Sequence, residues 1–160
     1  MPDVWNHEPP DYACPFCLLQ RGVHNERNAA DDVVAVTPLA FARISPTWWP
    51  ANHGAALVIP REHHENLYDL PRDVGHGLAD LVQQVAVAMR ASYGCDGIST
   101  RQHNEPGGGQ DVWHVHVHVF PRYVGDRLYE RQTEARRPTP EERAPYAGRL
   151  ATELGMPRSF

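Results

Sequence analysis

The chain of 160 residues contains no lysine: all 15 of its basic residues are arginine, and its formal net charge is −5 at neutral pH. A protein that binds the nucleic-acid backbone is expected to carry an excess of positive charge, so this balance argues against that class. The sequence has no apolar run long enough to span a bilayer, and its first residues lack a signal-peptide pattern. We therefore expect no nucleic-acid partner, no membrane partner and a cytoplasmic location.

Cysteine is also scarce, and two of the three cysteines form the close pair Cys14-Pro15-Phe16-Cys17. This usage fits a reducing compartment better than a disulfide scaffold. The spacing occurs both in zinc half-sites and in redox motifs, but a redox motif needs a buried strand before it and a helix after it. The preceding residues 9–12 (Pro-Pro-Asp-Tyr) are not a buried strand, which favours the zinc half-site.

The length predicts one globular domain, which we place at residues 14–125, between an extended N-terminal arm at 1–13 and a charged, proline-containing extension at 126–160. Residues 71–93 predict one long helix, because apolar residues recur there at three- and four-residue steps. Shorter apolar segments predict strands over 32–38, 41–44, 55–60 and 98–103, and residues 141–154 predict a short helix. The tryptophan pair at 48–49 lies in a loop, where it either packs on the core or forms a wall of a ligand pocket.

Three histidines in five residues mark the segment 113–122, where His114, His116 and His118 alternate with valines. The alternation predicts a strand with the histidines on one face and the valines on the other. Neighbouring imidazoles are then roughly 6.5–7 Å apart, close enough to form one site. Three interpretations compete: a polar strand face, one zinc site made of all three rings, or separate roles as nucleophile and metal ligand.

A glycine-rich turn over residues 104–110 leads into the histidine segment. Its three consecutive glycines, at 107–109, allow backbone N–H groups to approach a ligand closely, as phosphate binding requires. Flexible turns use the same residues, so the glycines alone are a weak signal.

Together these motifs resemble the histidine triad (HIT) family, whose signature is His-x-His-x-His followed by apolar residues. The likeness also includes Asn104, the Gly109-Gln110 pair before His114, and the strand 57–60 with a histidine three residues past its proline. The likeness covers roughly residues 12–125. The Phe-Pro-Arg ending at 120–122 looks more like the dinucleoside-polyphosphate-hydrolase branch than the short phosphoramidase branch. The resemblance implies an α+β fold, a mostly antiparallel five-stranded sheet with one long helix packed on it, and a homodimer.

The resemblance also implies roles for individual residues. His116, the middle histidine, would be the nucleophile that attacks the α-phosphate of a nucleotide and forms a nucleotidyl-histidine, which water then hydrolyses. His118 and Gln110 would support this chemistry. The substrate-binding residues would be Asn104, Gly108, Gly109, Gln110, His118 and, where this chain departs from the family, Arg43.

Members of the family that bind zinc carry a Cys-x-x-Cys pair and two histidines, one of them the first of the triad. Carried over to this chain, the ligands are Cys14, Cys17, His63 and His114, with His64 as a substitute for His63. A Cys2His2 set leaves no open position, so this zinc would be structural.

Three positions depart from the family pattern. Arg43 stands where an acid commonly holds the ribose hydroxyls, Asp111 stands where serine or threonine is common, and Gly54-Ala55 replaces a Gly-His pair. An arginine cannot accept hydrogen bonds from hydroxyls. Arg43 would bind a phosphate or a carboxylate, or else turn to solvent.

The sequence therefore predicts a nucleotide hydrolase or nucleotidyl transferase, acting through His116 on a dinucleoside polyphosphate or a nucleoside phosphoramidate. The alternative from a different class is a zinc-stabilised nucleotide or small-molecule binding module with little turnover.

Overall fold

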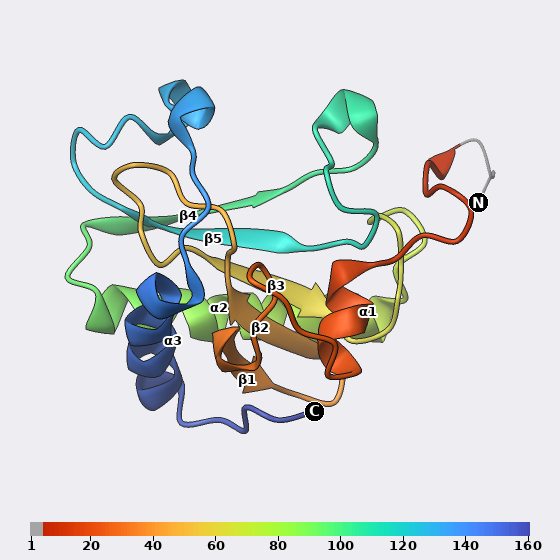
Figure 1. Ribbon diagram of the computed structural model, residues 1–160, viewed down its shortest axis with the longest axis horizontal. Coiled ribbons are helices and arrows are strands. Elements are labelled where there is room, and N and C mark those ends of the chain that lie inside the picture. Colours follow the sequence, from red (N-terminus) through yellow and green to blue (C-terminus); the bar gives the residue numbers. More distant parts are fainter. Residues whose placement is uncertain (1–4) are drawn as a thin grey trace.

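The computed structural model describes residues 5–160. A five-stranded sheet lies at its centre in the order β1-β2-β3-β5-β4, and every neighbouring pair is antiparallel (Figure 1). The α+β fold and the five-stranded sheet are therefore confirmed. The strands are β1 (Val33–Val36), β2 (Ala40–Ile44), β3 (Ala56–Pro60), β4 (Gly97–Gln102) and β5 (Val117–Arg122).

Three α-helices surround this sheet. They are α1 (Pro15–Gln20), α2 (Arg72–Ser92) and α3 (Pro140–Leu154). Short 3₁₀ turns occur at Ala30–Asp32, Pro106–Gly108, Leu128–Glu130 and Gln132–Glu134. No helix within residues 5–160 is long and apolar enough to cross a membrane.

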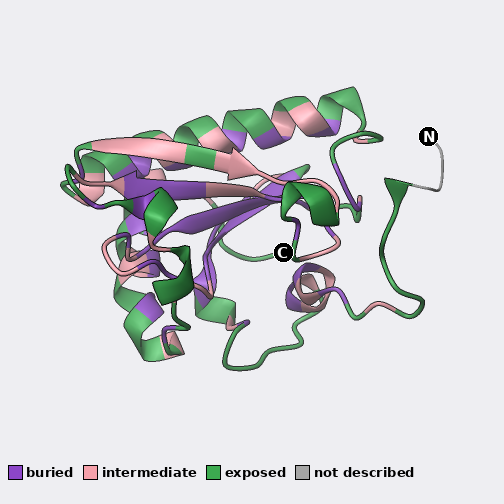
Figure 2. Ribbon diagram, turned by 90° about the horizontal axis from the view of Figure 1, so that it is seen from above, coloured by how far each residue is buried: buried purple, intermediate pink, exposed green. Residues whose placement is uncertain are grey.

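Helix α2 covers one face of the sheet, as its apolar stripe predicts. Leu81, Val85 and Met89 are fully buried and pack in one cluster with Ala42 and Val58 of the central strands. Figure 2 shows the helix lying along the sheet with its outer side exposed. The helix ends before Gly94, whose φ of 68° is a conformation that favours glycine.

The other face of β2 and β3 is covered by α1 and the segment before it. Phe41, Leu57 and Ile59 point to this side, where they form a second buried cluster with Phe16 and Leu19 of α1. Alternation along the central strands therefore divides their side chains between α2 and α1. The second face carries the histidines.

The prediction of a continuous strand over 113–122 is wrong for its first half. Strand β5 begins at Val117, and His114 and His116 lie in an irregular segment just before it. There the His114 N–H bonds to the Val112 carbonyl at 2.9 Å, which is a turn and not a ladder contact. Further along the chain, the His116 and His118 ring centroids are 5.0 Å apart, closer than the roughly 6.5–7 Å expected for alternate residues of an extended chain.

Residues 126–160 pack on the same sheet as the preceding residues. Helix α3 contacts α2, β1 and β2, and it buries Ala147 and Leu150 in the α2-side cluster. The last residues run beside β1, where the Val36 N–H donates to the Pro157 carbonyl at 2.7 Å. The C-terminal Phe160 packs edge-on against Phe41 at a centroid distance of 5.0 Å.

Asp126 anchors the turn that leads from β5 into the C-terminal residues. Its buried carboxylate accepts hydrogen bonds from Arg122 at 2.7 and 2.9 Å, from Asn52 at 2.9 Å, and from the Tyr123 and Leu128 N–H groups. The Arg122 guanidinium, followed by the other donors, holds the pKa of Asp126 well below its usual range.

Asp126→Ala is therefore expected to lower the free energy of unfolding by roughly 3 kcal/mol or more, because it leaves buried donors unpaired. An aspartate with a depressed pKa stabilises the fold above its unfolded pKa of about 3.9, and that contribution is lost as the pH falls toward the folded-state pKa. The difference between wild type and variant should thus be largest near neutral pH and shrink in acid. Chemical denaturation of wild type and variant across this pH range measures the difference, and Glu130→Ala, at an exposed residue, is the control. A constant difference would contradict the assignment.

Candidate metal centre and active site

Four side chains from three separate parts of the chain converge near the end of β3. Their ligand atoms, from Cys14, Cys17, His63 and His114, all lie within 4.8 Å of one another. The Cys14 sulfur is 3.4 Å from Nδ1 of His114, and the Cys17 sulfur is 3.4 Å from Nδ1 of His63. Zinc bonds of about 2.3 Å to sulfur and about 2.0 Å to nitrogen place tetrahedral ligand atoms about 3.5 Å apart. The four residues could hold a metal ion, and their spacing fits this geometry.

The second nitrogen of each histidine is also placed as a metal site requires. Nε2 of His114 lies 2.9 Å from the Pro60 carbonyl, and Nε2 of His63 lies 2.6 Å from the Glu8 carboxylate. Each of these nitrogens therefore carries its hydrogen and donates it, which leaves the Nδ1 lone pair directed toward the cysteines. Glu8, in the segment before α1, thus orients the candidate ligand His63, which lies 55 residues further along the chain.

Burial favours the neutral, uncharged forms of the Cys14 thiol and the His114 imidazole. It raises the pKa of the Cys14 thiol to about 12 and lowers the pKa of His114 to about 3. A neutral imidazole is the form that binds a metal, whereas the thiol needs a nearby cation before it ionises. The donor set is therefore suited to a soft divalent cation.

His116 lies two residues further along the chain and, unlike His114, lines a cavity. Its Nδ1 lies 2.8 Å from the His114 carbonyl, to which it donates its hydrogen, so the Nε2 lone pair is free. Burial lowers the pKa of His116, which keeps the ring neutral. The Phe16 ring packs edge-on against it, and the exposed Asp111 carboxylate lies 3.7 Å from Nε2.

The cavity in front of His116 measures about 590 Å³, within the range of small-molecule sites. His118 also lines it, and burial lowers the pKa of this ring too. Phe16, Leu57 and Trp49 form apolar walls. The adjacent Trp48 is buried among core residues, so the two tryptophans take different roles, one in the core and one in the pocket wall.

The glycine-rich turn lies outside this cavity lining. Gln110 donates both of its amide hydrogens to carbonyls, of Glu65 at 2.6 Å and Val112 at 2.9 Å, and its oxygen accepts from the Glu105 N–H. Asn104 is likewise engaged by Gln102 and by the Leu67 N–H. These side chains order the turn, and substrate contacts by Asn104, Gly108, Gly109 and Gln110 stay a prediction.

Arg43 is on the cavity wall, but it does not turn to solvent. It is 1% exposed, and its guanidinium pairs with Asp32 at 2.9 Å and bonds to the Asn28 side chain and the Arg27 carbonyl at 2.8 Å. The solvent-facing alternative for this arginine is therefore wrong.

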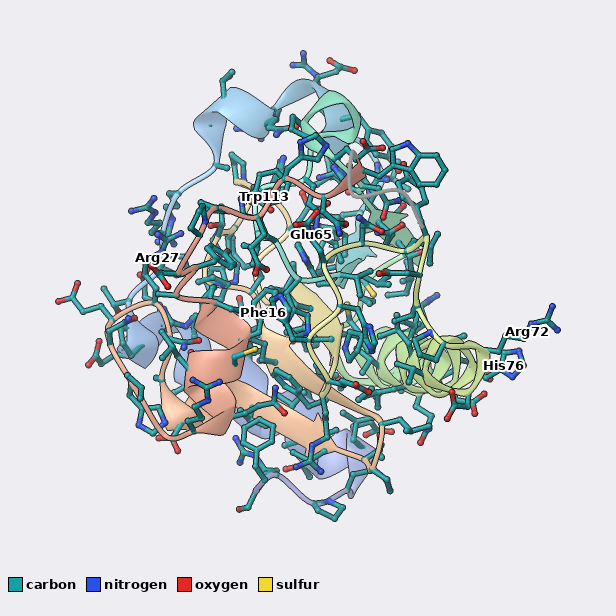
Figure 3. All side chains as sticks on the ribbon, turned by 90° about the vertical axis from the view of Figure 1, so that its right-hand side faces the viewer. Phe16, Arg27, Glu65, Arg72, His76 and Trp113 are labelled. Carbon is teal, nitrogen blue, oxygen red and sulfur yellow. The ribbon has the colours of Figure 1, made fainter. Side chains whose placement is uncertain are left out.

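Several cavity residues have no signal in the sequence. Phe16 lies in α1, between the two cysteines, Arg27 in an irregular loop, and Arg137 in the C-terminal residues. Figure 3 shows Phe16 and Arg27 on one side of the molecule, near the segment that carries Trp113. They come together only through the fold, because Arg27 and Arg137 are separated by most of the chain.

Comparisons with known proteins agree with this architecture. Residues 26–125 match the model of the HIT domain. An uncharacterised HIT-like protein of Methanocaldococcus jannaschii is 33% identical over 115 residues, which are 71% of this chain and 81% of the relative. An adenosine 5′-monophosphoramidase of Schizosaccharomyces pombe is 31% identical over 110 residues, 69% of this chain and 74% of that one. A zinc-bound histidine triad family protein of Mycobacterium smegmatis superimposes with a TM-score of 0.73 at 28% identity, covering 89% of this chain and 94% of the other.

Proposed function

This chain belongs to the HIT domain family, and on that premise we propose that it cleaves nucleotide conjugates at the α-phosphate through a nucleotidyl intermediate on His116. The substrate class is a nucleoside phosphoramidate or a dinucleoside polyphosphate. The acceptor is water in a hydrolase, or another nucleophile in a transferase.

One observation carries the proposal, namely the hydrogen bond from Nδ1 of His116 to the His114 carbonyl, which leaves Nε2 as a free nucleophile on the cavity wall. Nε2 would form a bond to phosphorus while the bond to the leaving group breaks and its electron pair departs with that group. The positive charge that develops on the ring is stabilised by the retained Nδ1–H···O=C bond. Water then forms a new P–O bond and gives up a proton while the P–N bond to His116 breaks; its electron pair returns to Nε2, which releases the nucleoside monophosphate and restores the neutral ring.

We propose that the metal at Cys14, Cys17, His63 and His114 is zinc in a structural role. Bound there, zinc would supply a closed tetrahedral crosslink and no open coordination position. The crosslink would fix the backbone of His114, whose carbonyl is the acceptor for His116. The metal ligands would thereby support the nucleophile without taking part in the reaction.

Turnover on a panel of conjugates tests the function. Adenosine 5′-phosphoramidate, diadenosine polyphosphates and nucleotide sugars are incubated with the protein, and nucleoside monophosphate is measured by chromatography. We expect release of the monophosphate from at least one of the first two classes. Binding of adenosine monophosphate with no turnover of any conjugate would instead identify a binding module, the alternative function.

We also propose a homodimer formed through β4. This strand is outermost in the sheet and half-exposed, and within residues 5–160 it pairs with β5 alone. An unpaired strand edge is a ready site for pairing with a second copy. Light scattering coupled to size-exclusion chromatography checks this, and a monomeric mass at high concentration would contradict it.

A further inference from the structure

The side chains that line the cavity carry more positive than negative charge. His116 and His118 line it together with Asp111, whose carboxylate lies 3.7 Å from Nε2 of His116, and within residues 5–160 Asp111 is the only acidic residue in the lining. The lining also contains three arginines, Arg27, Arg43 and Arg137, although the chain as a whole has a net charge of −5. Because the lining reverses the sign of the protein's overall charge, it is suited to an anion.

Arg43 belongs to a buried group with more positive than negative charge. The Asp32 carboxylate pairs with Arg43 at 2.9 Å and with Arg143 of α3 at 2.7 Å, and all three side chains are at most 2% exposed. Two guanidinium groups thus share one carboxylate. An excess buried positive charge is costly in a medium of low dielectric, and a nearby anion lowers that cost.

Arg27 and Arg137 remain free to supply the contacts themselves. Both are exposed, and neither side chain makes an ion pair or a hydrogen bond within residues 5–160. Their backbones are held in place. The Arg27 carbonyl accepts from Arg43 at 2.8 Å, and the neighbour of Arg137, Arg136, exchanges two backbone hydrogen bonds with Trp48. Free guanidiniums on an anchored backbone suit a phosphate group, which they bind through two parallel hydrogen bonds.

We propose that Arg27 and Arg137, backed by Arg43, bind a second phosphate of the substrate, carried on the 2′ or 3′ hydroxyl of its ribose. This inference rests on the proposed function, because the reacting α-phosphate is placed at His116. The ligand would then lie against Phe16, Leu57 and Trp49, apolar residues that line the same cavity as the arginines. Arg137 comes from residues 126–160, outside the matched HIT domain, so the C-terminal residues contribute to the choice of substrate.

Calorimetric titration of the wild-type protein tests the proposal. The ligands are adenosine monophosphate, adenosine 2′,5′-bisphosphate and adenosine 3′,5′-bisphosphate. A charge-assisted contact to the second phosphate should make one bisphosphate bind about tenfold to hundredfold more tightly than the monophosphate. The isomer that binds more tightly identifies the hydroxyl.

Two variants and a control test whether Arg27 and Arg137 cause the tighter binding of the bisphosphate. Arg27→Gln and Arg137→Gln should each reduce the preference for the bisphosphate at least threefold while leaving the affinity for the monophosphate within twofold. Arg21→Gln makes the same change of charge at an exposed residue outside the cavity lining and should leave the preference unchanged.

Equal affinities of wild type for all three ligands, or a preference that survives both variants, would overturn the inference while leaving turnover of conjugates intact. A protein that binds none of the three and turns over no conjugate would overturn the proposed function together with the inference.

Discussion

His116→Ala is expected to lower kcat on the best conjugate by roughly 10³-fold or more, because the variant has no nucleophile to form the covalent intermediate. The fold and the metal content should be retained, since the His116 ring faces the cavity and is not one of the four clustered ligands. Steady-state kinetics, with metal analysis of the same sample, measures both.

The matched control for this variant is His76→Ala. His76 is exposed on α2, and Figure 3 shows it projecting from the end of that helix, away from Phe16. This variant should keep the kcat of the wild type. Turnover by His116→Ala within a few-fold of wild type would contradict the assignment of the nucleophile.

Cys14→Ser is expected to produce the largest loss of stability. A structural metal contributes its binding free energy to folding, and the serine hydroxyl is a far poorer ligand for zinc than a thiolate. We expect a loss of at least about 4 kcal/mol, which corresponds to a fall in Tm of about 8–16 °C for a chain of this size. Calorimetry, together with elemental analysis of protein purified without added metal, should find one zinc per wild-type chain and less in the variant.

Cys95→Ala is the control for this experiment, because Cys95 is buried but lies outside the cluster. It should retain a full complement of zinc. Wild-type protein that contains no metal and joins Cys14 to Cys17 in a disulfide would contradict the metal site and support the redox interpretation of the cysteine pair.

The features that the sequence predicts well have short-range signals. The stripe of α2 and the apolar strands appear within a few residues of their expected bounds, because side-chain periodicity specifies which face is buried. The residues around the cysteine pair were also informative: within residues 5–13 the structure has no strand before Cys14, although α1 begins at Pro15, between the two cysteines. The convergence of Cys14, Cys17, His63 and His114 agrees with the ligand set implied by the family resemblance.

The features that the sequence does not predict depend on long-range contacts. The alternation of histidine and valine predicts a strand that includes His114. A local pattern does not reveal the turn at Val112–His114, nor that the His114 ring lies beside the cysteines. The sequence also does not predict the contacts of Arg43. Its partner Asp32 is shared with Arg143, which lies 100 residues further along the chain than Arg43. Arg137 joins Arg27 and Arg43 in the cavity lining only because the C-terminal residues pack on the rest of the fold.

The stereochemical course at phosphorus tests the central claim most directly. The protein is given a nucleotide conjugate with a chiral α-phosphorothioate in isotopically labelled water, and the configuration of the product is determined. Two successive displacements, first by His116 and then by water, invert the phosphorus twice, so we predict overall retention of configuration. Inversion would show that water attacks phosphorus directly, and it would contradict a covalent intermediate on His116.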